Sequence, residues 1–201
     1  MVGKKQFDRE LALEHATELF RQKGYVAASV DDLVNATGLS RSSLYGTFGN
    51  KEQLFVEVLD SYRADMMARL VPDPVAPPAQ ALESFLLELL DKLVAWGDRS
   101  GCLVTTTCSE FDNTPVAVQN SCTKGLREQE QQLVDYLQAA KRRGALPAAT
   151  DVESLASYFV AMRQSIGLLW RAGQPREKLA QIIKESVKIL DKPSPSARPR
   201  A

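Results

Sequence analysis

The sequence holds few of the residues that catalytic and metal-binding sites usually require. Its 201 residues include a single histidine, His15, and three cysteines, no two of which stand in the Cys-x-x-Cys spacing. A structural zinc site is therefore not expected. The chain also has no Gly-rich phosphate-binding loop, no nucleophile motif and no acid pair at a defined helical spacing. These absences argue against an enzyme, and we expect no catalytic residue, metal or cofactor.

Long apolar runs are also missing. No stretch approaches the about 18–20 apolar residues that a membrane-spanning helix needs. The first residues, MVGKKQFDREL, lack the apolar core of a signal peptide. We therefore expect no membrane association and a cytoplasmic location, in which the three thiols are reduced.

A net charge of one sign is absent as well. The 25 basic residues balance 25 acidic ones, and residues 1–51 hold seven basic and six acidic residues, a net charge of +1. Proteins that bind nucleic acids usually carry a more positive surface. Any affinity for DNA must therefore rest on where a few cations and backbone amides point, and on two copies of the chain acting together.

Apolar residues at helical spacing are abundant. Hydrophobic residues make up 44% of the chain, which is enough for a substantial core. They recur at three and four residues, and no strand-like alternation competes with that period. We expect an all-α protein of about nine helices, with three in an N-terminal head and a fourth that leads to a body of five.

Proline marks the boundary between head and body. Residues 71–78, VPDPVAPP, contain four prolines and cannot be helical throughout. We therefore expect a head at residues 1–50, a connecting helix at about 50–70 and a body at residues 71–191. The proline-rich end, residues 192–201, is expected to be a disordered tail.

Residues 29–51, SVDDLVNATGLSRSSLYGTFGNK, predict two short helices joined by a tight turn. The stretch begins with serine, a good N-cap, and Gly38 suits a left-handed turn. Ser40 caps a second helix, in which Leu44 and Phe48 form an apolar pair one turn apart. A short Gly-containing turn between two helices is typical of the helix-turn-helix, whose second helix enters the DNA major groove.

The same stretch closely resembles the DNA-binding domain of the tetracycline-repressor (TetR) family, over roughly residues 7–60. The matching positions are Ser29, Val30, Leu33, Gly38, Leu39, Ser40, Ser43, Leu44, Tyr45, Phe48, Asn50, Lys51 and Leu54. The resemblance implies a homodimeric repressor that binds a palindromic double-stranded DNA operator and is released by a small-molecule inducer. Val34 and Thr47 depart from the family pattern. A helical binding or scaffold protein whose head no longer binds DNA is therefore an alternative.

The second helix offers suitable chemistry for DNA. Arg41 can reach a guanine edge or a phosphate, and Gly46 lets the backbone approach the duplex closely. The resemblance implies that Arg41, Ser42 and Tyr45 face bases. The positions that it implies for phosphate contacts are Ser29, Val30, Ser43, Thr47 and Lys51.

In TetR-like proteins the helices of the body surround an inducer pocket. The candidate lining residues are Phe85, Leu89, Leu93, Trp96, Cys102, Thr106, Val118, Cys122, Leu126, Phe159 and Met162. The implied mechanism is a population shift, in which the ligand favours a state whose heads are too far apart for successive major grooves. The helix that begins near Asn50 would transmit the change.

The last two helices carry apolar stripes at bundle spacing, which we expect at the dimer surface. The stripes are Ile166, Leu169 and Trp170, followed by Leu179, Ile183, Val187 and Leu190. In the family the corresponding helices pair as a four-helix bundle across the dimer. Packing within one chain is the alternative.

The string Gly-Cys-Leu-Val at residues 101–104 resembles a TetR subgroup with Gly-Cys-Leu at this place, some of whose members sense electrophiles or oxidants through cysteine. Arg99 is close enough in sequence to activate Cys102. Cys108 and Cys122 add further thiols. A cysteine-based redox or electrophile sensor is thus an alternative to ligand release, although most such cysteines are inert small hydrophobes.

Overall fold

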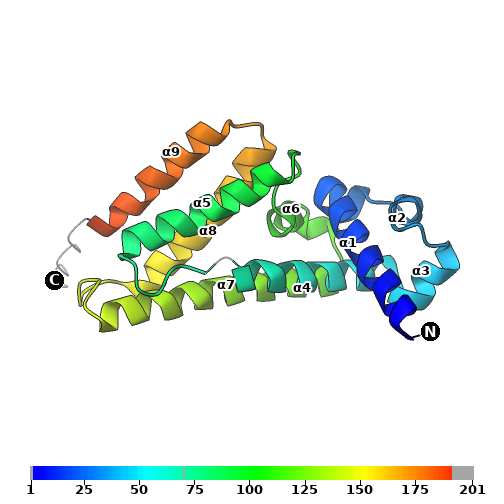
Figure 1. Ribbon diagram of the computed structural model, residues 1–201, viewed down its shortest axis with the longest axis horizontal. Coiled ribbons are helices and arrows are strands. Elements are labelled where there is room, and N and C mark those ends of the chain that lie inside the picture. The colour runs from blue at the N-terminus through cyan, green and yellow to red at the C-terminus, as the bar shows by residue number, and fades with distance from the viewer. Residues whose placement is uncertain (1, 70, 192–201) are drawn as a thin grey trace. The chain divides into compact units, whose positions relative to one another are not determined.

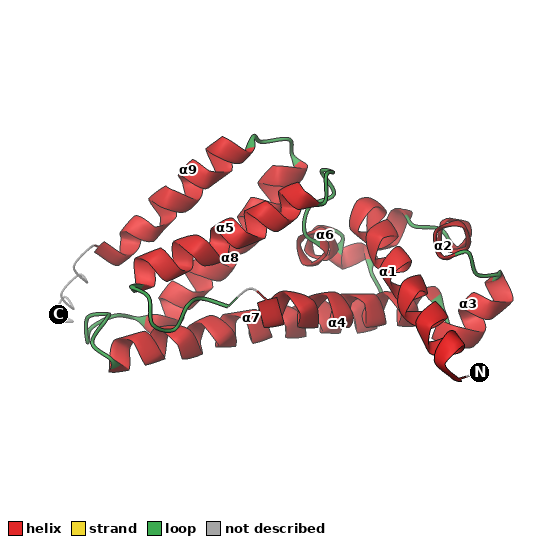
Figure 2. Cartoon of the chain, in the orientation of Figure 1, coloured by secondary structure: helices red, strands yellow, loops and turns green. Residues whose placement is uncertain are grey.

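The computed structural model describes residues 2–69 and 71–191 of the chain. Within these residues it has nine α-helices and no strand, so the all-α prediction is confirmed (Figure 1, Figure 2). The helices are α1 (Val2–Ala27), α2 (Val30–Thr37), α3 (Arg41–Phe48), α4 (Lys51–Arg69), α5 (Pro78–Ala95), α6 (Leu103–Ser109), α7 (Val116–Arg142), α8 (Val152–Arg171) and α9 (Arg176–Ser186). Two 3₁₀ helices, Phe111–Asn113 and Val187–Asp191, follow α6 and α9. The predicted disordered tail, 192–201, lies outside the described residues.

The chain forms two compact units. The first comprises Met1–Arg69 and Asp98–Leu126, and the second comprises Leu70–Gly97 and Arg127–Ala201. The first unit therefore contains α1–α4, α6 and the beginning of α7. Residues 98–126 group with the head in these units, whereas the sequence division at the proline-rich segment places them in the body.

An aromatic centre holds the head together. Phe20 of α1 and Phe55 of α4 are fully buried and meet edge to face, with 4.7 Å between ring centroids. Tyr25 lies 5.0 Å from the same Phe55 ring. Leu11, which the periodicity places in the buried stripe of α1, is 40% exposed. The buried face of α1 runs through residues 12, 16 and 20 instead.

The caps of the helix pair form as the sequence predicts. The Ser29 hydroxyl accepts a hydrogen bond from the Asp32 amide at 3.0 Å, while the Asp32 carboxylate accepts one from the Ser29 amide. Gly38 ends α2 with φ 68°, a left-handed conformation that glycine adopts without a steric penalty. The Ser40 hydroxyl then caps α3 by accepting from the Ser43 amide.

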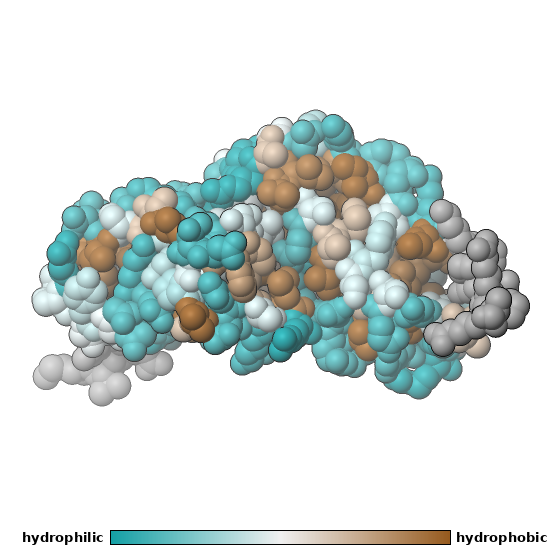
Figure 3. Space-filling view, turned by 180° about the vertical axis from the view of Figure 1, so that it is seen from behind, coloured by the Kyte–Doolittle hydropathy of each residue, from teal (hydrophilic) through white to brown (hydrophobic). Residues whose placement is uncertain are grey.

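The second unit is built on the apolar face of α5. Its buried side chains include Leu82, Phe85, Leu86, Leu89, Leu90 and Leu93. They contribute to a core with α8 and α9, and the face drawn in Figure 3 shows apolar patches over this unit. Thr150 and Glu153 fit a capping box in the sequence, but Asp151 caps α8 by accepting from the Ser154 amide at 3.1 Å. The carboxylate one residue later occupies the N-cap position and replaces the threonine.

The apolar stripes expected at a dimer surface lie mostly in the core of this unit. Five of the seven side chains are buried in the single chain: Ile166, Trp170, Leu179, Ile183 and Val187. Helical spacing identifies which face of a helix is buried. It does not show whether that face packs against a neighbouring helix of the same chain or against a second copy of the chain. On α8 the exposed large apolar residue is Leu168, with 51% exposure.

Candidate DNA-binding site

Helix α3 presents one polar face to solvent and one apolar face to the head. Leu44 and Phe48 are buried, at 3% and 6% exposure, and they fix the orientation of the helix. The opposite face exposes the candidate base-contacting residues, including Arg41 with 59% of its side chain exposed and Tyr45 at 41%. Ser42, Ser43 and Gly46 are also exposed. These five residues form the solvent-facing surface of a short, capped helix, which is the geometry that major-groove entry requires.

Arg41 is already paired within the free head. Its guanidinium donates to the Asp31 carboxylate of α2 at 2.6 Å, and this hydrogen bond raises the pKa of Arg41. Both side chains are largely exposed, so solvent weakens the pair. Arg41 can therefore exchange Asp31 for a guanine edge or a phosphate at little cost.

The hydroxyls at the start of α3 are close together. Ser40 Oγ lies 3.0 Å from Ser42 Oγ and 2.9 Å from Ser43 Oγ. This cluster brings three hydroxyl groups to the exposed N-terminus of the helix. Hydroxyls at such a position can donate to phosphate oxygens or to base edges.

Lys51, the candidate phosphate ligand at the start of α4, is held by an aromatic ring. Its Nζ lies 4.4 Å from the centroid of Tyr25, and the side chain is half-buried. Burial lowers the pKa of Lys51, and the nearby charges of Glu110 and Asp32 oppose that shift. Tyr25 thus orients the ammonium group, a support that the sequence reasoning did not identify.

The remaining phosphate candidates lie beside the recognition helix. Ser29 is exposed at the N-terminus of α2, whereas Val30 and Thr47 are half-buried. The first turn of α2 also carries Asp32, whose carboxylate pairs with Lys23 at 2.6 Å. The hydrogen bonds from Lys23 and Ser29 hold the pKa of Asp32 well below its usual value.

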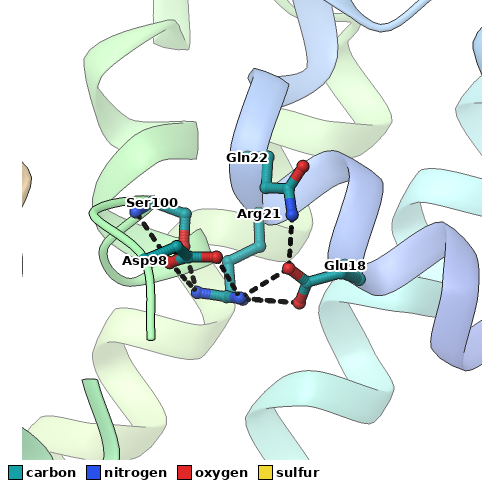
Figure 4. Close-up of polar contacts among 5 residues, drawn as sticks. All are labelled: Glu18, Arg21, Gln22, Asp98 and Ser100. Carbon is teal, nitrogen blue, oxygen red and sulfur yellow. Dashed lines mark hydrogen bonds and ion pairs between the residues drawn. The ribbon is translucent and has the colours of Figure 1, made fainter. Parts of the chain in front are cut away.

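A buried arginine joins α1 to the segment that precedes α6 (Figure 4). Arg21 donates to both carboxylate oxygens of Asp98, at 3.0 and 2.9 Å, and to the Ser100 hydroxyl. It also binds Glu18, one turn earlier on α1, at 2.6 Å. Burial opposes ionisation of Asp98, but the hydrogen bonds from Arg21 and Ser100 outweigh it and lower the pKa of Asp98 to about 2. Arg21 and Asp98 are 77 residues apart, which is why no local pattern predicts this network.

A second link joins the C-terminal end of α6 to the last residues of α1, beyond the kink at Gly24. The Glu110 carboxylate accepts hydrogen bonds from the backbone amides of Tyr25, at 2.8 Å, and Val26, at 3.3 Å. Gly24 makes room for the carboxylate, because a Cβ atom at this position would overlap it, and has φ 78°. Glu110 therefore fixes the backbone of the head at the residue that supports Lys51.

The candidate inducer-pocket residues are distributed over both units. Cys102, Thr106, Val118 and Cys122 are buried in the first unit, where Leu126 is half-buried. The other six candidates belong to the second unit: Phe85, Leu89, Leu93 and Phe159 are buried there, and Trp96 and Met162 are half-buried. Within each unit they contribute to the packing.

The described residues offer neither a metal site nor a membrane-spanning helix. Among the described residues, no group of three or more His, Cys, Asp or Glu side chains is placed to hold a metal ion. No helix in the described part of the chain is long and apolar enough to cross a membrane.

A capped helix-turn-helix with an exposed recognition helix, attached to further helices, defines a DNA-binding transcriptional regulator. Residues 12–58 match the bacterial regulatory proteins of the tetR family, and residues 79–186 match the tetracyclin repressor-like C-terminal domain. The chain belongs to the TetR family of transcriptional regulators.

Individual relatives agree with this assignment. The HTH-type transcriptional repressor ComR of Escherichia coli (strain K12) is 32% identical over 189 residues, covering 92% of this chain and 90% of ComR. The TetR family regulator CifR, in a cysteine-substituted form complexed with 26-bp operator DNA, is 25% identical with a TM-score of 0.77, covering 90% of this chain and 95% of CifR. A TetR regulator from Chloroflexus aurantiacus J-10-fl shares the fold with a TM-score of 0.79 at 21% identity, covering 94% and 96% of the two chains.

Proposed function

We propose that this regulator is a repressor that binds a palindromic operator as a homodimer and leaves it when a small ligand binds the body. The observation that carries the proposal is the exposed face of α3, where Arg41 and Tyr45 stand free of the core. A single head offers few phosphate contacts, and non-specific affinity at this scale is about 10⁻⁴–10⁻⁶ M. Two heads related by two-fold symmetry supply the contacts that one lacks.

The roles of the head residues follow from their positions. Arg41, Ser42 and Tyr45 contact bases, with Gly46 allowing close approach of α3 to the duplex. The phosphate contacts come from Ser29, Val30, Ser43, Thr47 and Lys51. ComR is described as a repressor and CifR was solved with operator DNA, which supports the same mode of action in this chain.

The functional division follows the sequence boundary. Residues 1–50 act as the DNA-binding head, α4 connects, and residues 71–191 bind the ligand and dimerise, with 192–201 as a tail. The six pocket candidates of the second unit then supply the apolar lining for that ligand: Phe85, Leu89, Leu93, Trp96, Phe159 and Met162. A ligand that separates the heads lowers affinity because both must enter successive major grooves. The protein acts without catalysis or cofactor, in the cytoplasm.

Assignment to the Gly-Cys-Leu subgroup rests on the start of α6. Gly101 has φ 77°, Cys102 stands at the N-cap of α6 and Leu103 is fully buried. The motif thus occupies a structured junction where a side chain at the glycine would be strained.

A gel shift with the full-length protein and DNA flanking its own gene tests the proposal. We expect a retarded complex that contains two chains per duplex. Footprinting of the same complex should show an inverted repeat protected from cleavage. Weakened retardation with rising salt is also expected, because phosphate contacts release counterions. Absent or salt-insensitive binding would contradict it and would favour a helical scaffold protein.

A further inference from the structure

Two of the three cysteines stand side by side on different helices. The Sγ atoms of Cys108, on α6, and Cys122, on α7, are 3.2 Å apart in a thiol–thiol hydrogen bond. This separation is about 1 Å longer than a covalent disulfide bond. Cys102 has a different partner, since its sulfur accepts a hydrogen bond from the Tyr62 hydroxyl at 3.6 Å. The thiol in the Gly-Cys-Leu motif, Cys102, is therefore not placed to react with another cysteine. Cys108 and Cys122 are.

The two paired thiols differ in access and in acidity. Cys108 is partly exposed, whereas Cys122 is fully buried. The hydrogen bond from Cys122 holds the pKa of Cys108 below its usual value, although burial opposes this effect. The hydrogen bond to Cys108 and burial both raise the pKa of Cys122. An accessible thiol that ionises first, next to a buried thiol that stays protonated, is the usual arrangement of an attacking and a resolving cysteine.

The pair is also connected to the DNA-binding head. Cys108 precedes Glu110 by two residues, and Glu110 holds the amides of Tyr25 and Val26. Tyr25 in turn supports Lys51, the candidate phosphate ligand. All of these residues belong to the first compact unit. A change at the end of α6 therefore reaches the head through one carboxylate and one aromatic ring.

We propose that Cys108 and Cys122 form a peroxide-reactive dithiol whose oxidation to a disulfide weakens operator binding. The disulfide step stands on the geometry alone, and the effect on DNA rests on the function proposed above. The reacting oxidant is hydrogen peroxide or an alkyl hydroperoxide. This site gives the regulator a second input, distinct from a ligand in the body.

The reaction balances with peroxide as the only oxidant. With hydrogen peroxide, the Cys108 thiolate attacks one oxygen and the O–O bond breaks. Cys108 becomes a sulfenic acid, and the departing hydroxide takes up the proton that the thiol released and leaves as water. The Cys122 sulfur then attacks the Cys108 sulfur, and its proton departs with the hydroxyl group as a second water. The two thiols lose two electrons and two protons together, and hydrogen peroxide is reduced to two waters; an alkyl hydroperoxide would give one alcohol and one water.

The bond acts on DNA binding by drawing α6 towards α7. Closing the sulfur gap shifts the last turn of α6 and with it Glu110, the residue that follows the helix. A carboxylate that accepts two amides tolerates little displacement, because hydrogen bonds weaken steeply with distance and angle. We expect operator affinity to fall by about tenfold, within the usual range of allosteric coupling.

The test uses the full-length protein, reduced with dithiothreitol, freed of the reductant and treated with hydrogen peroxide. Trypsin leaves all three cysteines on one peptide, because no Lys or Arg lies between residues 100 and 123. A glutamyl endopeptidase that cuts after Glu110 separates Cys122 from the other two. Mass spectrometry should then find Cys122 joined to Cys108, and gel shifts on the same samples should show the weaker binding, reversed by dithiothreitol.

Three serine variants identify which cysteines form the bond and whether that bond changes DNA binding. Cys102→Ser should form the bond and lose affinity like the parent, while Cys108→Ser and Cys122→Ser should form no intramolecular bond and keep their affinity. A bond to Cys102, or equal loss of affinity in Cys108→Ser, would overturn the site. A Cys108–Cys122 bond with unchanged DNA binding would overturn the regulatory step. Failure of the reduced protein to bind any operator would instead contradict the proposed function and leave the disulfide result to stand by itself.

Discussion

At the scale of single residues, we propose that Arg41 contacts a base and Lys51 contacts a phosphate. Arg41→Ala should remove a base contact and cost about 1–3 kcal/mol on the operator, with little effect on random DNA. Titrations of operator and scrambled duplexes by fluorescence anisotropy measure the two affinities. Equal loss on both duplexes would show that Arg41 contacts phosphate rather than a base.

Lys51→Ala should weaken binding to every sequence alike. The reason is that a phosphate contact carries no sequence information, so the salt dependence should also become shallower by about one unit of slope. Anisotropy titrations at several salt concentrations measure that slope. A loss confined to the operator, with the slope unchanged, would assign Lys51 to base readout.

Asp98 makes the stability of the fold depend on pH in the acid range. Its pKa falls from an ordinary value of 3.8 to about 2 in the folded chain, so the stability it contributes is present above 3.8 and is lost as the pH falls towards 2. Asp98→Asn should therefore be less stable than the parent near neutral pH, and the difference should shrink across that acid interval. Urea unfolding of both proteins at a series of pH values measures the difference. A gap that stays constant with pH would show that Asp98 acts through packing instead.

At the scale of elements, the kink near the end of α1 depends on Gly24. An alanine there must adopt φ near 78° and displace the Glu110 carboxylate. Gly144→Ala is a matched control, since Gly144 has φ 77° and open space around its Cβ position. Both variants should lose about 1–3 kcal/mol of stability to backbone strain.

The Gly24 variant should lose more than its control, because it also breaks the contact with α6. Thermal unfolding of the two variants and the parent gives the comparison. Equal losses at both positions would mean that Glu110 moves aside freely, which would also weaken the proposed route from α6 to the head.

Local elements were predictable from the sequence where their chemistry is local. Asn50 and Gln53 fit a capping box in the sequence, and this box forms, with hydrogen bonds of 3.1 and 2.8 Å, because both partners lie within one turn. The predicted N-cap of α8, Thr150, was wrong by one residue. Thr150 and Asp151 both have side chains that can cap a helix, and only the folded backbone decides between them. Long-range links such as Arg21 with Asp98 have no local signal at all.

In the candidate site too, features set by local sequence were predictable, and features set by the packing of distant helices were not. The exposed face of α3 follows from helical spacing, since the burial of Leu44 and Phe48 determines which residues face outwards. The support of Lys51 by Tyr25 depends on how α4 meets the end of α1. The Cys108–Cys122 pairing depends on how α6 meets α7, so three thiols in the sequence could not be sorted into pairs.

At the scale of the whole molecule, dimerisation requires an exposed apolar surface that a second copy of the chain can cover. The structure buries most of the expected α8 and α9 stripes within one chain, which leaves Leu168 as the exposed large apolar residue of α8. We predict that Leu168→Glu converts the dimer into monomers without unfolding it, because a charge would be buried unpaired between two copies. Sedimentation velocity measures the oligomeric state.

Val75→Glu is the control for that experiment, since Val75 is 83% exposed and lies outside α8 and α9. It should remain a dimer. A Leu168→Glu protein that also stays dimeric would place the interface on another surface.

Sequence-specific operator binding is tested by the affinity of the full-length protein for its operator and for a scrambled duplex of equal length, measured by anisotropy over a range of salt. We predict a dissociation constant of about 10⁻⁸–10⁻¹¹ M for the operator, about a thousandfold or more tighter than for the scrambled duplex, and both affinities should fall as salt rises. Equal affinity for the two duplexes, or operator binding that salt does not weaken, would contradict it.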